Sequence, residues 1–576
     1  MNRTLRARPF GPLLAAACML GMQAPALAQA PVEPTTWEEA LARYREVMKR
    51  LPFRYHTQGR DSLAKTRRPE AFELLKADYQ GSKEYPEYAK YTVASMLGRE
   101  FGAPEFTAPL ALLRASCDKP ADAWLWVLTL RNQARNGGGA DVLEVATRAK
   151  TPLQRACGIL ALGMAQSDQL TGAIVQTCAE FPKKEKEADR IVLLGAMTGA
   201  IHENAKRVND EKFREGLRAY ISLLGEDIAL TETMKVQVAR LLQPLLNAPA
   251  AFMDPASWLA LLERGDVKAP AAGRTVVKPS FFGIESDGER ICYVLDLSDS
   301  MCREIAPNVK PSGPVTGPKQ KKPKGVMPDE SDLPWAIIRT RWDLAREQLK
   351  ISLQRLSGEK YFSIVWFGDS SGSFDSTKGM VRATKANVAK AIAELDSIKP
   401  DKPDPVKAPD GVLRGKTNMH SGLRRAFGLA GKGTIEEGAY VDPSTLKEGC
   451  DTIFLLSDGA PSWDDFEVRD KDYGEDQVVV DTEYGAAAAR TEMLVYHGPY
   501  VLDDWLVDDV IRMNTFRRAR IHCIGFGEAK MQLLDRIAKS CGGQVYSVGA
   551  PKPQQPAPGQ PGGAAPGSAP PGVRPK

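Results

Sequence analysis

The chain divides into two regions by the spacing of its apolar residues. From residue 36 to about residue 265, apolar side chains recur at i, i+3 and i+4 between breaks at Gly, Pro and Asn, which predicts a succession of amphipathic helices. Three apolar segments lie about 40 residues apart, a period typical of helical-repeat proteins: LQRACGILALGMAQ, ADRIVLLGAMTGAI and MKVQVARLLQPLLN. We expect an all-α helical-repeat domain over 36–265, with an irregular helical bundle as the alternative.

Residues 288–550 show a different pattern, in which short continuous apolar runs alternate with helical spacing. The runs ICYVLDL, YFSIVWF, IFLLSD and RIHCIGFG are each typical of a buried strand, and RTRWDLAREQLKISLQRL predicts a helix between the first two. Strands that alternate with helices indicate an open α/β sheet. The stretch 266–287 has the composition of a linker between the two regions.

Three separated segments of this α/β region carry oxygen-bearing side chains next to predicted strands or helices. Asp296, Ser298 and Ser300 follow the first strand in a D-x-S-x-S pattern, Thr417 precedes a helical segment, and Asp458 ends the run IFLLSD. Such loops gather at the carboxyl ends of the strands in an open α/β sheet. Because Mg2+ prefers about six oxygen ligands, we expect the hydroxyls to coordinate it directly and the carboxylates to hold its waters. One position then stays open for a ligand.

At these five positions the chain resembles the von Willebrand factor type A (VWA) domain, whose metal-ion-dependent adhesion site has an Asp-x-Ser-x-Ser motif followed by Thr and Asp. The resemblance implies a doubly wound, Rossmann-like α/β fold and one bound Mg2+, with Mn2+ or Ca2+ as alternatives. It also implies capture of an acidic side chain of a partner protein, with Thr417 joining the ion when that ligand is engaged, and it implies no catalysis. Asp299 stands where the family often has Gly.

The amino-terminal residues predict export. Residues 1–28 have a basic start, an apolar stretch and an Ala-Leu-Ala cleavage signal at 26–28, as in a secretory signal peptide. HEAT-like helical repeats followed by a VWA domain are similar to a group of exported bacterial proteins. We therefore expect a mature chain that begins at Gln29 and acts in the periplasm or outside the cell, with lipid anchoring at Cys18 as the alternative. No further segment approaches the roughly 18 apolar residues of a membrane span.

The cysteines give no metal motif, because none has the CxxC spacing of a zinc site. Cys292 and Cys523 lie inside predicted strands, where a cysteine is most often a small buried apolar residue. Cys302 and Cys450 flank the metal-site segments and are better candidates for a disulfide, which an oxidising compartment permits.

Charge separates two insertions from the rest of the chain. The formal net charge of +5 gives no indication of nucleic-acid binding. Insertion 303–334 is rich in Pro, Gly and Lys, and we interpret it either as a guide for an acidic partner or as a solvated loop. Its clustered lysines are Lys319, Lys321, Lys322 and Lys324. Insertion 462–500 is acidic and is placed to regulate access to the site, and 551–576 predicts a disordered Pro- and Gly-rich tail.

One serine requires a separate hypothesis, because GDSSG at 368–372 matches the G-x-S-x-G pattern of a hydrolase nucleophile, Ser370. That motif needs a helix directly after the serine, whereas SFDSTKGM is rich in turn residues. The possible bases are His420, His497 and His522, of which His522 lies in a predicted buried strand and His420 is expected to be an exposed first-turn residue. We therefore expect a binding protein and not an enzyme. Cation-independent binding through the helical surface is the alternative, and a serine hydrolase is the remote one.

Overall fold

The structure is a computed structural model that covers most of the two predicted regions. It describes residues 36–49, 53–81, 86–181, 187–265, 278–309, 327–399, 413, 415–466, 468–470, 479–480, 489–490, 494–496 and 498–549. The expected signal peptide 1–28 with Cys18, the clustered lysines of the first insertion and the expected tail 551–576 lie outside these residues.

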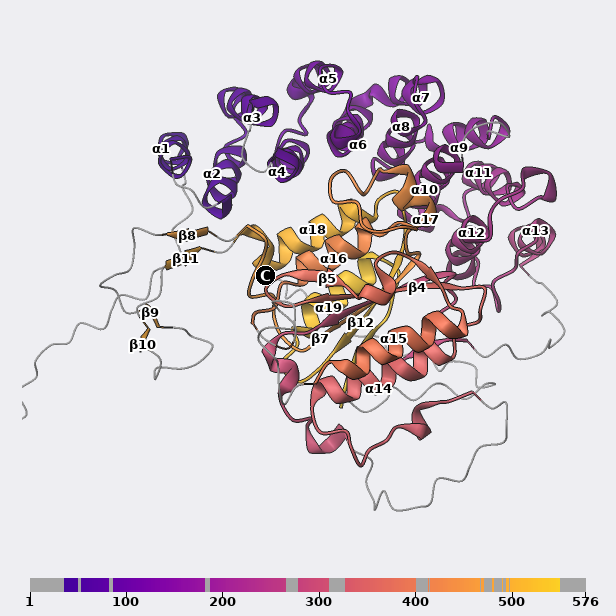
Figure 1. The fold of residues 1–576 in the computed structure, drawn as a ribbon. Helices are drawn as coiled ribbons and strands as arrows, with labels where there is room; N and C mark the ends of the chain where they lie inside the picture. The colour runs from indigo at the N-terminus through magenta and orange to yellow at the C-terminus, as the bar shows by residue number, and fades with distance from the viewer. Residues whose placement is uncertain are drawn as a thin grey trace, which may run out of the picture.

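The first region is helical. Its α-helices are α1 (Trp37–Val47), α2 (Phe53–Lys65), α3 (Pro69–Gly81), α4 (Pro86–Glu100), α5 (Thr107–Ala115), α6 (Ala123–Gln133), α7 (Gly139–Arg148), α8 (Pro152–Met164), α9 (Leu170–Ala179), α10 (Glu187–Glu203), α11 (Glu211–Ser222), α12 (Glu232–Leu245) and α13 (Pro255–Arg264). They form an arc of two rows, with the even-numbered helices inside and the odd-numbered helices outside (Figure 1). Polar residues start several of them, such as Thr36 and Thr151, each in a capping box.

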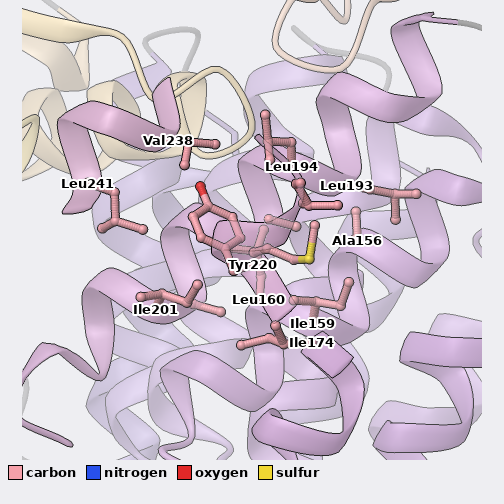
Figure 2. Packing of buried hydrophobic residues seen from close by; sticks show 14 of the residues in the cluster. Ala156, Ile159, Leu160, Ile174, Leu193, Leu194, Ile201, Tyr220, Val238 and Leu241 are labelled. Atoms are coloured by element: carbon pink, nitrogen blue, oxygen red, sulfur yellow. The ribbon is translucent and has the colours of Figure 1, made fainter. Parts of the chain in front are cut away.

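Apolar side chains hold the two rows together. Figure 2 shows the core between α8, α9, α10 and α11, where Leu160, Ile174 and Leu193 are buried. Tyr220 is also buried, and its hydroxyl lies 2.7 Å from Oγ1 of Thr198. The inner helices pack against one another, and α2, α4, α6 and α8 also pack against the outer row, so one continuous core runs along much of the arc.

The second region is an α/β domain. Its main sheet comprises β3 (Arg290–Asp296), β4 (Tyr361–Phe367), β5 (Ser371–Ser373), β6 (Val381–Arg382), β7 (Thr452–Ser457), β12 (Arg520–Gly525) and β13 (Val545–Ser547). The order is β13-β12-β7-β3-β4-β5, and β6 also pairs with β4. The pairs among β13, β12, β7, β3 and β4 are parallel, whereas β5 and β6 are antiparallel to β4. A helical region followed by an α/β region agrees with the fold class expected from the sequence.

Helices cover both faces of this sheet. They are α14 (Arg341–Gln354) and α15 (Lys385–Ser397) on one face, and α16 (Met419–Gly428), α18 (Asp503–Asn514) and α19 (Met531–Ser540) on the other (Figure 1). Alternate residues of β3 serve the two faces, since Ile291 and Tyr293 pack with α14 whereas Cys292 and Val294 pack with α16 and α18. The hairpin of β1 (Ser280–Phe281) and β2 (Ile284–Glu285) adds Phe281 to the first core.

The inner row of the arc packs onto the α/β region. The backbone of α10 approaches so closely that a Cβ on Gly195 would lie 1.9 Å from the carbonyl oxygen of Phe516. Lys447, in the short helix α17 (Pro443–Glu448), forms an ion pair with Glu187 of α10 at 2.9 Å. Farther along, the guanidinium of Arg512 lies over the ring of Tyr91. The helical region and the sheet are therefore one packed structure.

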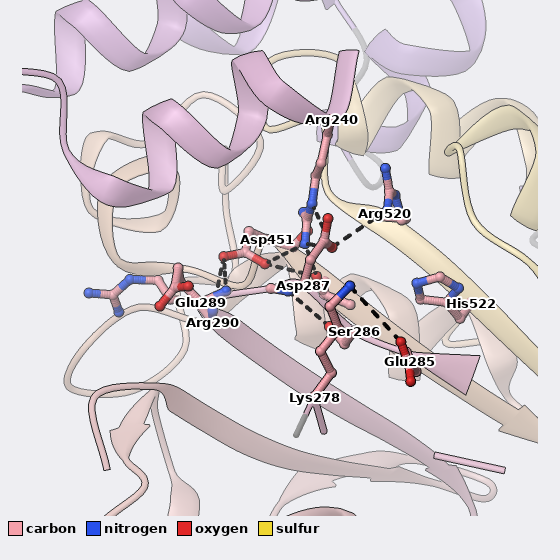
Figure 3. Close-up of polar contacts among 12 residues, drawn as sticks. Arg240, Lys278, Glu285, Ser286, Asp287, Glu289, Arg290, Asp451, Arg520 and His522 are labelled. Atoms are coloured by element: carbon pink, nitrogen blue, oxygen red, sulfur yellow. Dashed lines mark hydrogen bonds and ion pairs between the residues drawn. The ribbon is translucent and has the colours of Figure 1, made fainter. Parts of the chain in front are cut away.

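A buried ionic cluster ties α12 to the amino ends of the central strands (Figure 3). Arg240 donates to Asp287 Oδ1 at 2.8 Å, to the carbonyl oxygen of Asp451 at 2.8 Å and to Thr452 Oγ1 at 2.8 Å. Arg520 lies 3.5 Å from Asp287. Burial raises the pKa of Asp287, but Arg240 and Arg520 outweigh burial and hold that pKa at about 2.

The second insertion begins at a buried carboxylate. Asp464 accepts hydrogen bonds from the backbone N–H groups of Phe466, Gly498 and Tyr500, at 3.0, 2.9 and 2.9 Å. These bonds hold the two ends of the insertion together. Between them lie short antiparallel pairs, β8 (Val468–Asp470) with β11 (Leu494–Tyr496) and β9 (Val479–Val480) with β10 (Ala489–Arg490). Whether this insertion regulates access stays a prediction.

Within the described part of the chain, no helix combines the length and the apolar character that crossing a membrane requires.

Candidate metal centre at the carboxyl edge of the sheet

The five oxygen-bearing residues selected from the sequence lie at one edge of the sheet. Asp296 ends β3, and Ser298 and Ser300 follow in the next turn. Asp458 directly follows β7, and Thr417 precedes the N-cap of α16. Because β3 and β7 are parallel neighbours, their carboxyl ends meet. Hydrogen bonds connect four of the five residues, and Thr417 lines the same cavity as Ser300 and Asp458.

The D-x-S-x-S turn is closed by its own hydrogen bonds and tied to β7. Asp296 Oδ1 accepts from the backbone N–H of Ser298 at 3.0 Å, and its Oδ2 accepts from the Ser457 hydroxyl at 2.8 Å. The hydroxyls of Ser298 and Ser300 lie 3.0 Å apart, and Ser300 Oγ donates to Asp458 Oδ1 at 2.6 Å. Two carboxylates and two hydroxyls are thereby gathered from two strands.

Two glycines bring the Thr417 segment close to its neighbours. The backbone of Thr417 exchanges hydrogen bonds with Ser462, as its N–H donates to Ser462 Oγ at 3.1 Å and its carbonyl accepts from Ser462 N at 3.1 Å. A Cβ on Gly459 would lie 3.2 Å from Thr417 Oγ1, and one on Gly415, which has φ +85°, would lie 2.4 Å from Asp369 Oδ1. Among the described residues, the Thr417 hydroxyl has no hydrogen-bond partner.

The edge encloses a cavity large enough for more than a few waters. Its volume is about 520 Å³, and Ser300, Thr417 and Asp458 contribute to its wall. The other charged residues of the wall are Asp299, Arg303, Lys416 and Glu528. A ligand that enters would therefore meet both carboxylates and basic groups.

The surroundings of the two site carboxylates disfavour their ionised forms. Burial, followed by the neighbouring charge of Asp458, raises the pKa of Asp296 to about 7. Burial also raises the pKa of Asp458, although Ser300 and Arg341 oppose the rise. Both side chains are essentially inaccessible to solvent. A cation at this edge would relieve the cost of keeping both groups ionised.

Arg341 is the site residue that the sequence argument missed. Its Nη1 donates to Asp458 Oδ2 at 2.8 Å, and its Nη2 donates to Glu528 Oε2 at 2.5 Å. The sequence did contain an indication that Arg341 has an anionic partner, because Arg341 is the first residue of α14. A cation is disfavoured at a helix N-terminus by the helix dipole, so an arginine there indicates an anionic partner elsewhere in the fold.

The donor set fits a hard divalent cation. Carboxylate and hydroxyl oxygens are the ligands that Mg2+ prefers, and soft metals prefer thiolates. Across the described ranges, no three His, Cys, Asp or Glu side chains are grouped as a metal cluster. An ion here would consequently depend on the hydroxyls of Ser298, Ser300 and Thr417 as well as on the two carboxylates.

The Ser370 segment lines a different pocket. This pocket, of about 290 Å³, is bordered by Ser370, Ser371, Ser421, Arg424, Arg425, Thr434, Ile435, Glu436 and Asp465. No histidine is among these residues, and Ser371 Oγ lies 2.8 Å from Ser421 Oγ. Ser370 precedes the short strand β5 rather than a helix. A serine hydrolase therefore gains no support from this geometry.

Of the three histidines considered as bases, His420 and His522 are buried, and His497 lies outside the described residues. The expectation that His420 is exposed is wrong, because its Nε2 lies 2.6 Å from Asp509 Oδ2 and its ring stacks on Tyr500 at 3.7 Å. The physical reason is that the first turn of α16 packs beneath α18 and the helical arc. His522 is a core residue as expected; burial lowers its pKa to about 3, and its Nδ1 accepts from Gln544 N at 3.2 Å.

The proposed Cys302–Cys450 disulfide is also wrong, since the structure has no disulfide bond between these two residues. Cys302 follows the carboxyl end of β3, whereas Cys450 precedes β7 at the opposite edge of the sheet. The Cys302 thiol approaches the carbonyl oxygen of Leu413, and the Cys450 thiol approaches that of Ala426. Flanking the site segments in sequence did not place the two cysteines together in space.

No family model matches the chain, and no curated protein matches it in sequence.

Proposed function

We propose that this protein binds one divalent cation at the carboxyl edge of its sheet and uses it to capture an acidic side chain of a partner protein. In this proposal the α/β region is a VWA domain and the edge is its metal-ion-dependent adhesion site. The observation that supports it best is the cluster of two buried carboxylates and three hydroxyls at one end of β3 and β7. Mg2+ is the expected ion, with Mn2+ and Ca2+ as alternatives.

The residues have different roles in this proposal. Ser298 and Ser300 coordinate the ion directly, and Thr417, whose hydroxyl has no partner in the described residues, joins when the ligand is engaged. Asp296 and Asp458 supply charge and orient metal-bound waters. The cavity beside them leaves room for an oxygen from outside the chain. This assignment is a binding function and includes no catalytic residue.

The rest of the chain is assigned on weaker support. We propose that the arc is a HEAT-like repeat array, which its two alternating rows favour. Its inner row already packs on the α/β region through residues such as Arg240, so the arc first serves to hold that region. Export to the periplasm or the cell exterior is proposed from the amino-terminal sequence alone.

Calorimetry with the full chain tests the function. Mg2+ and Mn2+ are titrated into EDTA-treated wild type, Asp296→Asn and Ser370→Ala, the last a control in the neighbouring pocket. We expect saturable binding to one site in wild type and in the control, and affinity reduced by about tenfold or more in Asp296→Asn. Ion at about 100 times Kd should stabilise wild type by about 2.7 kcal/mol.

The decisive negative result is a wild-type protein that binds neither ion, alone or with a short Asp-containing peptide present. Equal binding by wild type and Asp296→Asn would also reject the site, because the ion would then lie elsewhere. If a partner is later captured in the presence of EDTA as well as without it, recognition belongs to the helical surface.

A further inference from the structure

Arg341 places a fixed positive charge inside the proposed cation site. Its side chain is 9% exposed, and it contacts Asp458 Oδ2 at 2.8 Å. The backbone around it is well anchored: Thr340 and Asp343 form a capping box at the start of α14, and Arg341 N donates to the carbonyl oxygen of Arg303 at 3.0 Å. The guanidinium is therefore held by the fold and is not a mobile surface group.

The neighbouring loop is shaped to accommodate this guanidinium. Gly527 follows β12 with φ +47°, and a Cβ there would lie 2.4 Å from Arg341 Nη2. The next residue, Glu528, accepts from the same Nη2 at 2.5 Å. Any other residue at 527 would have to displace the guanidinium from its place between Asp458 and Glu528. The sequence of this loop is thus matched to the position of Arg341.

The charged groups around Asp458 differ in how strongly solvent screens them. Glu528 is 63% exposed and also lies 3.5 Å from Arg303, so solvent and a second cation weaken its effect. Asp296, Asp458 and Arg341 are shielded from solvent, where electrostatic interactions are stronger. A divalent ion with Asp296 and Asp458 alone would form a neutral centre. With Arg341 included, the buried centre carries a net charge of plus one when loaded.

We propose that Arg341 makes binding of the cation and binding of an anionic ligand depend on one another. By pairing with Asp458, the guanidinium weakens binding of the bare ion. By leaving the loaded centre positive, it favours a carboxylate over a neutral oxygen as the completing ligand. This inference rests on the proposed function, because it concerns the same site, but it assigns a specificity-determining role to a residue outside the five ligand positions.

Arg303 provides a matched control. Both arginines face Glu528, but Arg303 is 60% exposed and makes no contact with Asp458. Mn2+ is titrated by calorimetry into full-length wild type, Arg341→Gln and Arg303→Gln, each without additive, with acetate and with acetamide. Acetate is the carboxylate probe, and acetamide is its neutral counterpart. Thermal melts of each variant report whether it is folded.

We expect Arg341→Gln to bind Mn2+ about tenfold more tightly than wild type and Arg303→Gln to stay within about threefold, as the burial of the two charges predicts. Acetate should strengthen Mn2+ binding in wild type and less so in Arg341→Gln, and acetamide should not. An unchanged or weaker affinity in Arg341→Gln overturns the inference while leaving the cation site intact. Absence of binding in every variant, with or without acetate, rejects the proposed function itself.

A second variant keeps the test decisive if Arg341→Gln does not fold. Glu528→Gln removes the other carboxylate partner of Arg341, so the guanidinium should pair more strongly with Asp458. We expect Mn2+ affinity to fall about threefold, in the opposite direction from Arg341→Gln. A gain in affinity in Glu528→Gln would contradict the inference, because it would show that Arg341 does not compete with the ion.

Discussion

Two aspartates lie at each end of the central strands β3 and β7, and the two pairs differ in the cations that contact them. At the amino ends, Asp287 and Asp451 both contact Arg240, and Arg520 adds a second cation near Asp287. At the carboxyl ends, Arg341 contacts Asp458, and it is shared with a third carboxylate, Glu528. The pKa of Asp287 is held at about 2, whereas burial and Asp458 raise the pKa of Asp296 to about 7.

The difference favours a structural role for the amino ends and supports the ligand-binding role proposed for the carboxyl ends. Buried carboxylates with a full set of cations act as an interdomain connection, and removing a cation leaves them uncompensated. Buried carboxylates without enough positive charge reduce stability and are typical of sites completed by a ligand. We therefore expect opposite roles for these aspartates at the two edges, because the arc supplies Arg240 to the amino edge, and no described residue of the arc contacts Asp296 or Asp458.

The largest effect is expected at the amino-terminal edge. Arg240→Ala should lower the free energy of unfolding by about 3 kcal/mol, because it leaves the buried Asp451 and the half-buried Asp287 without their main cation. Urea-induced unfolding followed by tryptophan fluorescence measures the change. The control is Arg218→Ala, which also removes an arginine with two carboxylate partners, Glu211 and Glu263, but at an exposed position. That control should cost much less, because solvent screens an exposed ion pair. Equal effects of both substitutions would show that the Arg240 cluster stabilises the fold no more than an exposed ion pair does.

The residues of the candidate site could be selected from the sequence because each belongs to a short motif of neighbouring residues. Asp296, Ser298 and Ser300 lie within five consecutive residues, and Asp458 directly follows an apolar run that is typical of a buried strand. Parallel pairing of buried strands then brings their carboxyl ends to one edge.

The remaining features depend on contacts between residues far apart in the chain. Arg240 meets Asp451 across 211 positions, and Arg341 meets Asp458 across 117. The spacing of apolar residues along the chain does not predict contacts between residues so far apart in sequence. The burial of His420 has the same origin, because helical spacing shows that a residue begins a helix but not that a second helix and the arc cover it. The Cys302–Cys450 error arose because proximity to the site in sequence was read as proximity in space.

Opposite pH responses are expected at the two edges. An unfolded Asp has a pKa of about 3.9, so the raised pKa of Asp296 means that its contribution to stability is present below about pH 4 and is lost as the pH rises through 7. The lowered pKa of Asp287 has the reverse sign: its contribution is present above about pH 4 and is lost as the pH falls toward 2. Mg2+ competes with the proton on Asp296, so its stabilising effect should increase between pH 5.5 and pH 8, by at most about 1.4 kcal/mol per pH unit.

Thermal melts with and without Mg2+ across this range measure the response. Asp296→Asn removes the titrating group, so the metal-free protein should lose its decline in stability between pH 4 and 7, and Mg2+ should stabilise it less at pH 8 than it stabilises wild type. A Mg2+ effect of the same size at pH 5.5 and pH 8 would show that Asp296 is already ionised without the metal. The carboxyl edge would then resemble the amino edge.

The smallest effect is expected for an exposed carboxylate at the carboxyl edge, and it can be compared with the effect of a buried one. Asp299 lines the same cavity as Asp458 but is exposed, and its backbone N–H donates to the carbonyl oxygen of Gly415 at 3.3 Å. Asp299→Asn should weaken Mg2+ binding by about threefold in low salt, because an exposed charge attracts the ion only through water. In about 0.5 M salt, screening should remove most of this difference, whereas the loss caused by Asp296→Asn should persist because that carboxylate is buried. If Asp299→Asn instead weakens binding as much as Asp296→Asn at both salt concentrations, Asp299 contacts the ion directly, and the site is completed by an exposed carboxylate that the family pattern does not contain.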